Sequence, residues 1–146
     1  MSVREAPGKS TEELLERAAG NYVELVYGTL EFLQRKGISI TEYAAWIGAR
    51  HAETWSPGGT AMELAGEMAA NMLSVGAKTA DVTGDEMRAR VVLAGWPPAG
   101  SERYPVDPAD VDRFLDLIHP IAERQGCAFE RDRDGDRLVM TFVRGS

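Results

Sequence analysis

Residues 43–72 concentrate side chains that can hold a small molecule or move a proton. Aromatic, imidazole and thioether groups recur there at Tyr43, Trp46, His51, Trp55, Met62, Met68 and Met72. Flexible thioethers and aromatic walls suit an adaptable pocket for a small apolar or amphipathic ligand. Apolar residues at helical spacing also form plain cores, so packing between two helices is the competing interpretation. The segment predicts either a binding pocket or a helix–helix core.

His51 is the candidate in this segment for acid–base chemistry. An imidazole exchanges protons near neutral pH, and Tyr43, Glu53 or Glu63 is a possible partner for it. This set supports an alternative hypothesis, a small hydrolase or isomerase that uses His51 with Tyr43 or Glu63. A helical histidine is also common as a hydrogen-bonded or partly exposed residue without a catalytic role.

Zinc and nucleophilic chemistry find little support in the sequence. The candidate zinc ligands are His51, His119 and Cys127, and no C-x-x-C, H-x-x-x-H or H-E-x-x-H spacing occurs. No serine lies in a G-x-S-x-G elbow, and no glycine-rich phosphate loop is present. Cys127 follows a predicted helix at the start of a strand, where a buried structural thiol is common. We therefore expect no metal and no cofactor.

An acidic run near the C-terminus resembles the start of a calcium-binding loop. Asp132, Asp134 and Asp136 match the first three ligand positions. Arg137 stands at the sixth position, where glycine is required, and Val143 stands at the twelfth, where glutamate is required. The Asp-Gly pair within this run favours a hairpin turn instead.

Composition limits the class of protein and its partners. The chain has 146 residues, 44% of them hydrophobic, so we expect one domain, residues 10–146, after a flexible N-terminus, residues 1–9. A formal charge of −7 disfavours nucleic acid and anionic membranes as partners. No apolar run approaches the roughly 18 residues of a membrane span, and no signal peptide is visible. With a single cysteine, we expect a cytoplasmic protein.

Periodicity and capping residues predict the order of the elements. Three helices come first: one from the Ser10–Glu13 capping box to Lys36, one from a Thr41 cap to about Thr54, and one from the Thr60–Glu63 box to about Val75. Two hairpins follow, within residues 79–94 and 127–143, joined by a helix that Asp107 caps and Pro120 should kink. The pattern predicts an α+β fold, with three N-terminal helices followed by a ββαββ four-stranded antiparallel sheet packed on helices.

The first predicted helix is apolar on two sides. Its main stripe comprises Leu15, Ala18, Ala19, Tyr22, Val26, Leu30 and Leu33. A second stripe comprises Leu14, Leu25 and Phe32. Such a helix lies between two layers or at an oligomer interface. We therefore expect a homodimer whose interface includes part of residues 14–33.

Four arginines of the two predicted hairpins form a possible row on the sheet. If the hairpins are adjacent, Arg88 and Arg90 share a face with Arg131 or Arg133. Such a row can bind a carboxylate, but it also fits a solvated sheet face that neighbouring acidic residues balance. We favour the solvated face.

The sequence thus favours a self-associating small-molecule-binding or sensory domain with an apolar pocket between helices. Two alternatives stay open, the hydrolase or isomerase described above and a structural interaction module without a ligand. An apolar cavity with one polar end favours binding, whereas a closed core around Trp46 and Trp55 favours the structural module. A cavity in which His51 meets a carboxylate or tyrosine favours the enzyme.

Overall fold

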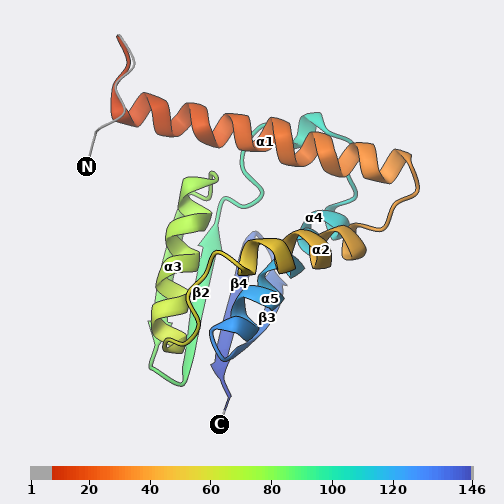
Figure 1. Ribbon diagram of the computed structural model, residues 1–146. Coiled ribbons are helices and arrows are strands. Elements are labelled where there is room, and N and C mark those ends of the chain that lie inside the picture. Colours follow the sequence, from red (N-terminus) through yellow and green to blue (C-terminus); the bar gives the residue numbers. More distant parts are fainter. Residues whose placement is uncertain (1–7, 146) are drawn as a thin grey trace.

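The structure, a computed structural model, describes residues 8–145 (Figure 1). The predicted flexible N-terminus, residues 1–9, lies almost wholly outside the described residues. The helices are α1 (Thr11–Arg35), α2 (Ile40–Ala52), α3 (Ala61–Ser74), α4 (Pro108–Phe114) and α5 (Ile118–Arg124), with 3₁₀ turns η1 (Ser101–Arg103) and η2 (Leu115–Leu117). The strands are β1 (Thr79–Gly84), β2 (Arg88–Ala94), β3 (Cys127–Asp134) and β4 (Arg137–Arg144). The predicted α+β class is confirmed, with three N-terminal helices before the ββαββ sheet.

Short polar side chains start the first three helices. The Ser10 hydroxyl accepts a hydrogen bond from the N–H of Glu13, and Thr60 and Glu63 form the complete capping box of α3. The predicted cap of α2, Thr41, is wrong. Ser39 caps this helix and accepts from the N–H of Glu42 at 3.3 Å. Thr41 therefore falls inside the first turn, because both residues are good caps and α2 begins two residues earlier than expected.

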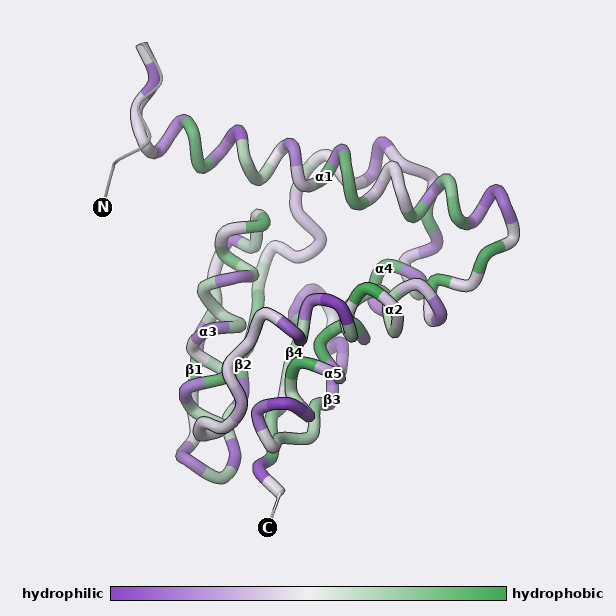
Figure 2. Tube along the Cα trace, in the orientation of Figure 1, coloured by the Kyte–Doolittle hydropathy of each residue, from purple (hydrophilic) through white to green (hydrophobic). Residues whose placement is uncertain are grey.

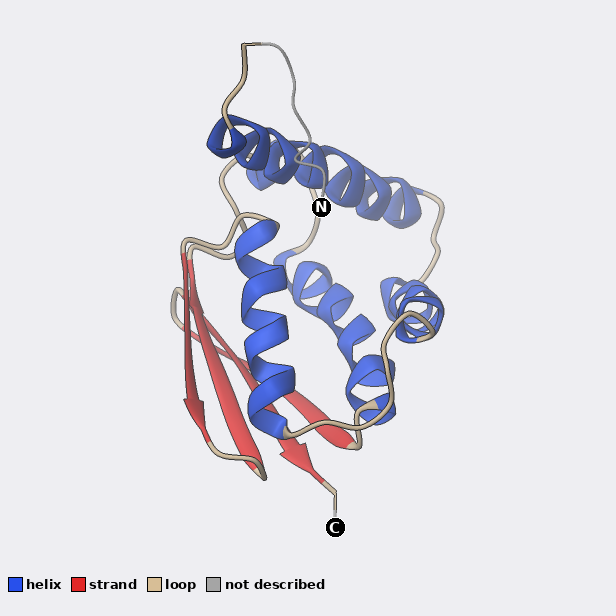
Figure 3. Cartoon of the chain, turned by 60° about the vertical axis from the view of Figure 1, so that its left-hand side comes forward, coloured by secondary structure: helices blue, strands red, loops and turns tan. Residues whose placement is uncertain are grey.

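The four strands form one antiparallel sheet in the order β1-β2-β4-β3. Side chains alternate across the sheet, so Val91 and Leu93 of β2 and Met140 and Phe142 of β4 face the helices, and all four are buried. In the described chain, no helix covers the opposite face of the sheet (Figure 3). The sheet thus has one face in the core and one face toward solvent.

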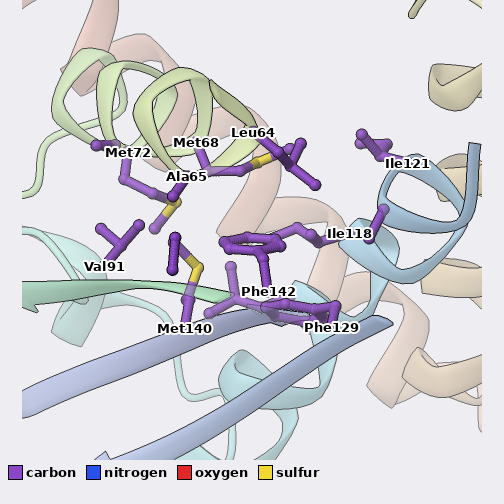
Figure 4. Packing of buried hydrophobic residues seen from close by; sticks show 14 of the residues in the cluster. Leu64, Ala65, Met68, Met72, Val91, Ile118, Ile121, Phe129, Met140 and Phe142 are labelled. Atoms are coloured by element: carbon purple, nitrogen blue, oxygen red, sulfur yellow. The ribbon is translucent and has the colours of Figure 1, made fainter. Parts of the chain in front are cut away.

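Helices cover the inner face of the sheet in two layers. α3 packs on β1, β2 and β4, while α5 packs on β3. α2 lies farther out, against α4, η2 and α5, and α1 crosses one end of the molecule (Figures 1 and 3). Figure 4 shows the core between α3, α5 and the sheet, where Met68 and Met72 lie above Met140 and Phe142. This arrangement places α2 and α3 on either side of the α5 segment.

The helix predicted between the hairpins is interrupted, as its proline suggested. Asp107 caps α4 by accepting from the N–H of Ala109 at 2.9 Å. Helix geometry gives way to the 3₁₀ turn η2 before α5 resumes at Ile118. Pro120 has no N–H to donate to the carbonyl of Asp116, and its ring crowds that carbonyl, so the regular α-helix breaks one turn before it.

The predicted arginine row is divided between the two faces of the sheet. Arg88 and Arg90 alternate with buried residues of β2 and lie exposed on the uncovered face. Arg131 and Arg133 instead share the parity of buried Phe129 and lie on the face that the helices cover. The expected shared face is therefore wrong, because the register of β3 sends these two side chains the other way.

Arg131 and Arg133 tie the sheet to the helical layer. Arg131 donates to both carboxylate oxygens of Asp116, at 2.8 and 3.1 Å. Arg133 donates to both oxygens of Asp112, at 3.0 and 2.8 Å, and to the carbonyl of Trp96 at 3.2 Å. Each pair is half-buried, and the nearby carboxylate raises the pKa of both guanidinium groups. These bidentate pairs fix α4 and η2 against β3.

α1 is long but contributes few residues to the core. Its buried residues are Val23, Tyr27 and Leu30, which lie from the middle of the helix onward. Apolar residues recur along its whole length, as Figure 2 shows, and Leu25 and Phe32 remain 72% and 57% exposed. The two apolar sides predicted for this helix therefore include one that the described chain leaves uncovered. Among the helices formed by residues 8–145, none has the length and apolar composition that crossing a membrane requires.

Candidate functional site

A pocket of about 350 Å³ lies between α2 and α3, with the α4–η2–α5 segment along one side and α1 at one end. Its apolar lining comprises Ile47 of α2, Met68 and Met72 of α3, Val75 after it, and Phe114, Leu115, Leu117, Ile118 and Ile121 of the α4–η2–α5 segment. Four polar residues complete the lining: Tyr22, His51, Asn71 and Ser74. The site is therefore an apolar hollow with few polar groups, the usual form of a small-molecule site.

The walls of the pocket are made by residues that also belong to the core. Met68 and Met72 lie one turn apart on α3 and are 3% and 5% exposed. Ile118 and Ile121 face them from α5 and are equally buried (Figure 4). Because these side chains pack against the sheet as well as the pocket, the rigid core holds the wall in place.

Tyr22 is the residue of α1 that lines the pocket in the described chain. The residue is half-buried, and its ring lies 6.2 Å from that of Trp96. Its hydroxyl makes no hydrogen bond within the described part of the chain. Burial raises the pKa of Tyr22 above its usual range, so the phenol stays protonated and can donate a hydrogen bond.

His51 lies exposed in the last turn of α2, at the rim of the pocket. Glu63 does not meet it there, because its carboxylate accepts the N–H of Thr60 in the capping box at the N-terminus of α3. Tyr43 does not line the pocket either, and its ring stacks on that of Phe114 at 6.1 Å. The candidate catalytic set His51, Tyr43 and Glu63 is therefore not assembled in this pocket.

Four of the predicted ligand-binding residues lie elsewhere. Trp46 is 60% exposed and stacks on Tyr43, which reaches the pocket only through Phe114. Trp55 packs on the core beyond the end of α2, and its carbonyl accepts a hydrogen bond from Arg124. Met62 is 37% exposed near the start of α3. The structure thus brings His51, Met68 and Met72 into one pocket and leaves Tyr43, Trp46, Trp55 and Met62 out of it.

Sequence reasoning missed most of the wall opposite α3. Leu115, Ile118 and Ile121 belong to the helix predicted between the two hairpins, and Tyr22 belongs to the main apolar stripe of the first predicted helix, so none of them was assigned to a pocket. A usable signal lies in α2, whose buried residues include Ala44, Gly48 and Ala52 at intervals of four. Such a stripe of small residues indicates the side of α2 that approaches another backbone.

The Cys127 thiol and a metal site, the other candidates from the sequence, have weaker structural support than the pocket. Burial raises the pKa of the Cys127 thiol, which disfavours the reactive thiolate. In the part of the chain that the structure describes, no group of three or more His, Cys, Asp or Glu side chains is placed to hold a metal ion.

Comparison with known proteins adds no assignment. No protein-family model matches the chain, and no curated protein matches its sequence. The geometry of the pocket is therefore the basis on which a function is proposed.

Proposed function

We propose that this protein is a small-molecule-binding or sensory domain whose site is the apolar pocket between α2 and α3. The observation that supports this is the pocket itself, about 350 Å³ in volume and lined by nine apolar and four polar residues. Ligand pockets usually span about 300–1,000 Å³ and combine apolar walls with few polar groups. The ligand is a small apolar or amphipathic molecule.

A sensory role fits the position of α1. A ligand in this pocket contacts Tyr22, and α1 is held to the rest of the described chain by few buried residues. Ligand binding can therefore change how firmly α1 is held and how its uncovered face is presented. We propose that this face, which includes Leu25 and Phe32, forms a homodimer in the cytoplasm.

The two alternatives have weaker support. For a hydrolase or isomerase, the supporting feature is the imidazole of His51 at the rim, but no carboxylate lines the pocket in the described chain. For a structural module without a ligand, a closed core would be the supporting feature, and the open hollow beside Met68 and Met72 argues against it. The net charge of −7 disfavours a nucleic-acid partner.

A fluorescent-probe titration tests the binding function. The neutral dye N-phenyl-1-naphthylamine should bind the parent protein and lose most of its binding in Ile47→Trp, which fills the pocket from its α2 side. The matched control is Ala45→Trp, an exposed position of the same helix outside the lining. Absence of dye binding to the parent would contradict the proposal, and so would equal binding by both variants.

A further inference from the structure

The polar groups of the pocket carry no fixed charge. None of its lining residues in the described chain is Asp, Glu, Lys or Arg, and its polar members are Tyr22, His51, Asn71 and Ser74. A charged group that enters an apolar hollow without a partner of opposite charge loses its hydration with little compensation. The lining therefore penalises both carboxylates and ammonium groups relative to neutral ones.

The rim of the pocket also disfavours anions. His51 lies in the last turn of α2, and Asn71 and Ser74 lie in the last turn of α3. The C-terminal end of a helix carries a partial negative charge, so the ends of both α2 and α3 place such a charge near lining residues of the pocket. Arg50 in the last turn of α2 offsets one of them but does not line the pocket, and α3 has no basic residue in its last turn.

Neutral hydrogen-bonding groups remain free for a ligand. In the described chain, the Tyr22 hydroxyl and the Asn71 side-chain amide make no hydrogen bond, whereas the Ser74 hydroxyl donates to the carbonyl of Asn71 at 2.6 Å. A ligand oxygen can accept from the Tyr22 hydroxyl or the Asn71 amide. The oxygen of an alcohol, a ketone, an ether or an amide can accept such a hydrogen bond without the cost of burying a charge.

We infer that the pocket selects an uncharged amphiphile, with an apolar body against α3 and α5 and a neutral oxygen function at Tyr22 and Asn71. This inference rests on the proposed binding function. It names the class of the ligand and makes Tyr22 and Asn71 the residues that determine it.

Competition among three ligands with the same chain tests the inference. Decan-1-ol, decanoate and decylammonium are titrated against bound N-phenyl-1-naphthylamine at pH 8, where a carboxylic acid is ionised and an alkylamine is protonated. Decanol should displace the dye at concentrations roughly tenfold lower than either ion, since a charge without a partner is costly to bury. Equal displacement by decanoate or decylammonium overturns the ligand class and leaves the proposed site standing. A parent protein that does not bind the dye overturns both.

Substitutions at the two polar residues test their assigned roles. Tyr22→Phe keeps the ring and should weaken decanol about fivefold, the usual effect of one lost hydrogen bond, while dye binding stays within about twofold. Tyr43→Phe, outside the pocket, is the matched control and should change neither. An unchanged decanol affinity in folded Tyr22→Phe overturns the role of this hydroxyl.

Asn71→Lys supplies the missing charge at an exposed rim position, so the variant does not disturb the core. Decanoate should then bind several-fold more tightly than it binds the parent. Asn21→Lys on α1, exposed and outside the lining, should leave decanoate unchanged. No gain in Asn71→Lys, or an equal gain in both variants, overturns the assignment of Asn71 to the ligand's polar end.

Discussion

Gly48 of α2 lies against the backbone of Leu117 in η2. A Cβ atom at position 48 would stand 2.8 Å from the Leu117 Cα and still closer to its carbonyl oxygen, distances that a side-chain carbon does not tolerate. This contact sets how closely α2 approaches the α4–η2–α5 segment. It thereby places two lining residues of α2 at the pocket, Ile47 directly before Gly48 and His51 almost one turn after it.

The first prediction concerns this close approach. Gly48→Ala should lower the free energy of unfolding by about 1–3 kcal/mol, because backbone atoms must move apart to admit the methyl group. Gly66→Ala is the matched control, since Gly66 also lies within a helix and has open space around its Cα. It should raise stability by about 0.5–1 kcal/mol through helix propensity. Urea denaturation measures both, and a stabilised Gly48→Ala would contradict the contact.

Local signals account for most of the fold that the sequence predicts correctly. The caps Ser10, Thr60 and Asp107 act on backbone groups two or three residues away, so their effect is visible without tertiary structure. The alternation along β2 and β4 likewise reports one buried face. Pro120 breaks the helix through its own missing N–H.

The candidate site depends on which face of α2 is buried, and this is a tertiary property. The aromatic residues suggested that Tyr43 and Trp46 point toward α3. The small residues Ala44, Gly48 and Ala52 instead form the buried face, because they allow the backbone of α2 to approach η2 and α5. The size of the aromatic side chains therefore predicted the wrong face of α2 as the one toward the pocket. The helical spacing of Met68 and Met72 on α3, in contrast, located the opposite wall of the pocket correctly.

The second prediction contrasts two tryptophans. Trp46 is 60% exposed, so Trp46→Ala should cost less than about 1 kcal/mol of stability. Trp96 is 3% exposed and packs in the main core, so Trp96→Ala should cost about 3–5 kcal/mol. Thermal unfolding separates the two. Iodide should quench much less of the fluorescence in Trp46→Ala than in the parent, and comparable losses of stability would contradict these placements.

The third prediction concerns the ion pair between Arg133 and Asp112. Its side chains are 29% and 18% exposed and share two hydrogen bonds, so a double-mutant cycle with alanine should give a coupling of about 1–2 kcal/mol. The helical pair Glu31–Arg35, whose arginine is 73% exposed, serves as the control and should couple by about 0.3–0.5 kcal/mol. Equal coupling energies would show that Arg133 does not brace α4 against the sheet.

The fourth prediction is a pH dependence at the turn between β1 and β2. The Asp85 carboxylate accepts the N–H groups of Met87 at 2.8 Å and Arg88 at 3.0 Å, which hold its pKa below the usual value. A lowered pKa in the folded state means that the stabilisation is present above the unfolded pKa of about 3.9 and is lost as pH falls through the folded value.

Asp85→Asn should therefore be less stable than the parent at pH 7, with a smaller difference near pH 2. Asp81→Asn on β1 is the control, because its carboxylate makes no hydrogen bond in the described chain. Thermal unfolding at the two pH values measures the differences. A gap between the parent and Asp85→Asn that does not narrow at low pH would contradict the role of the carboxylate charge.

The last prediction concerns the uncovered side of α1. Leu14, Leu25 and Phe32 are separated by 11 and 7 residues, close to three and two helical turns, so they lie along one side of the helix. Val23 and Tyr27 face the opposite way into the protein.

If the side of α1 with Leu14, Leu25 and Phe32 joins two copies, light scattering at micromolar concentration should give twice the chain mass of 15.9 kDa. The double variant Leu25→Gln with Phe32→Gln should give the mass of one chain while keeping its thermal stability, because both side chains are exposed within the single chain. Met87→Gln removes another exposed apolar side chain, at 53% exposure beyond α1, and should leave the dimer intact. A parent protein of monomer mass, or a dimer that survives the double variant, would show that this side of α1 does not mediate self-association.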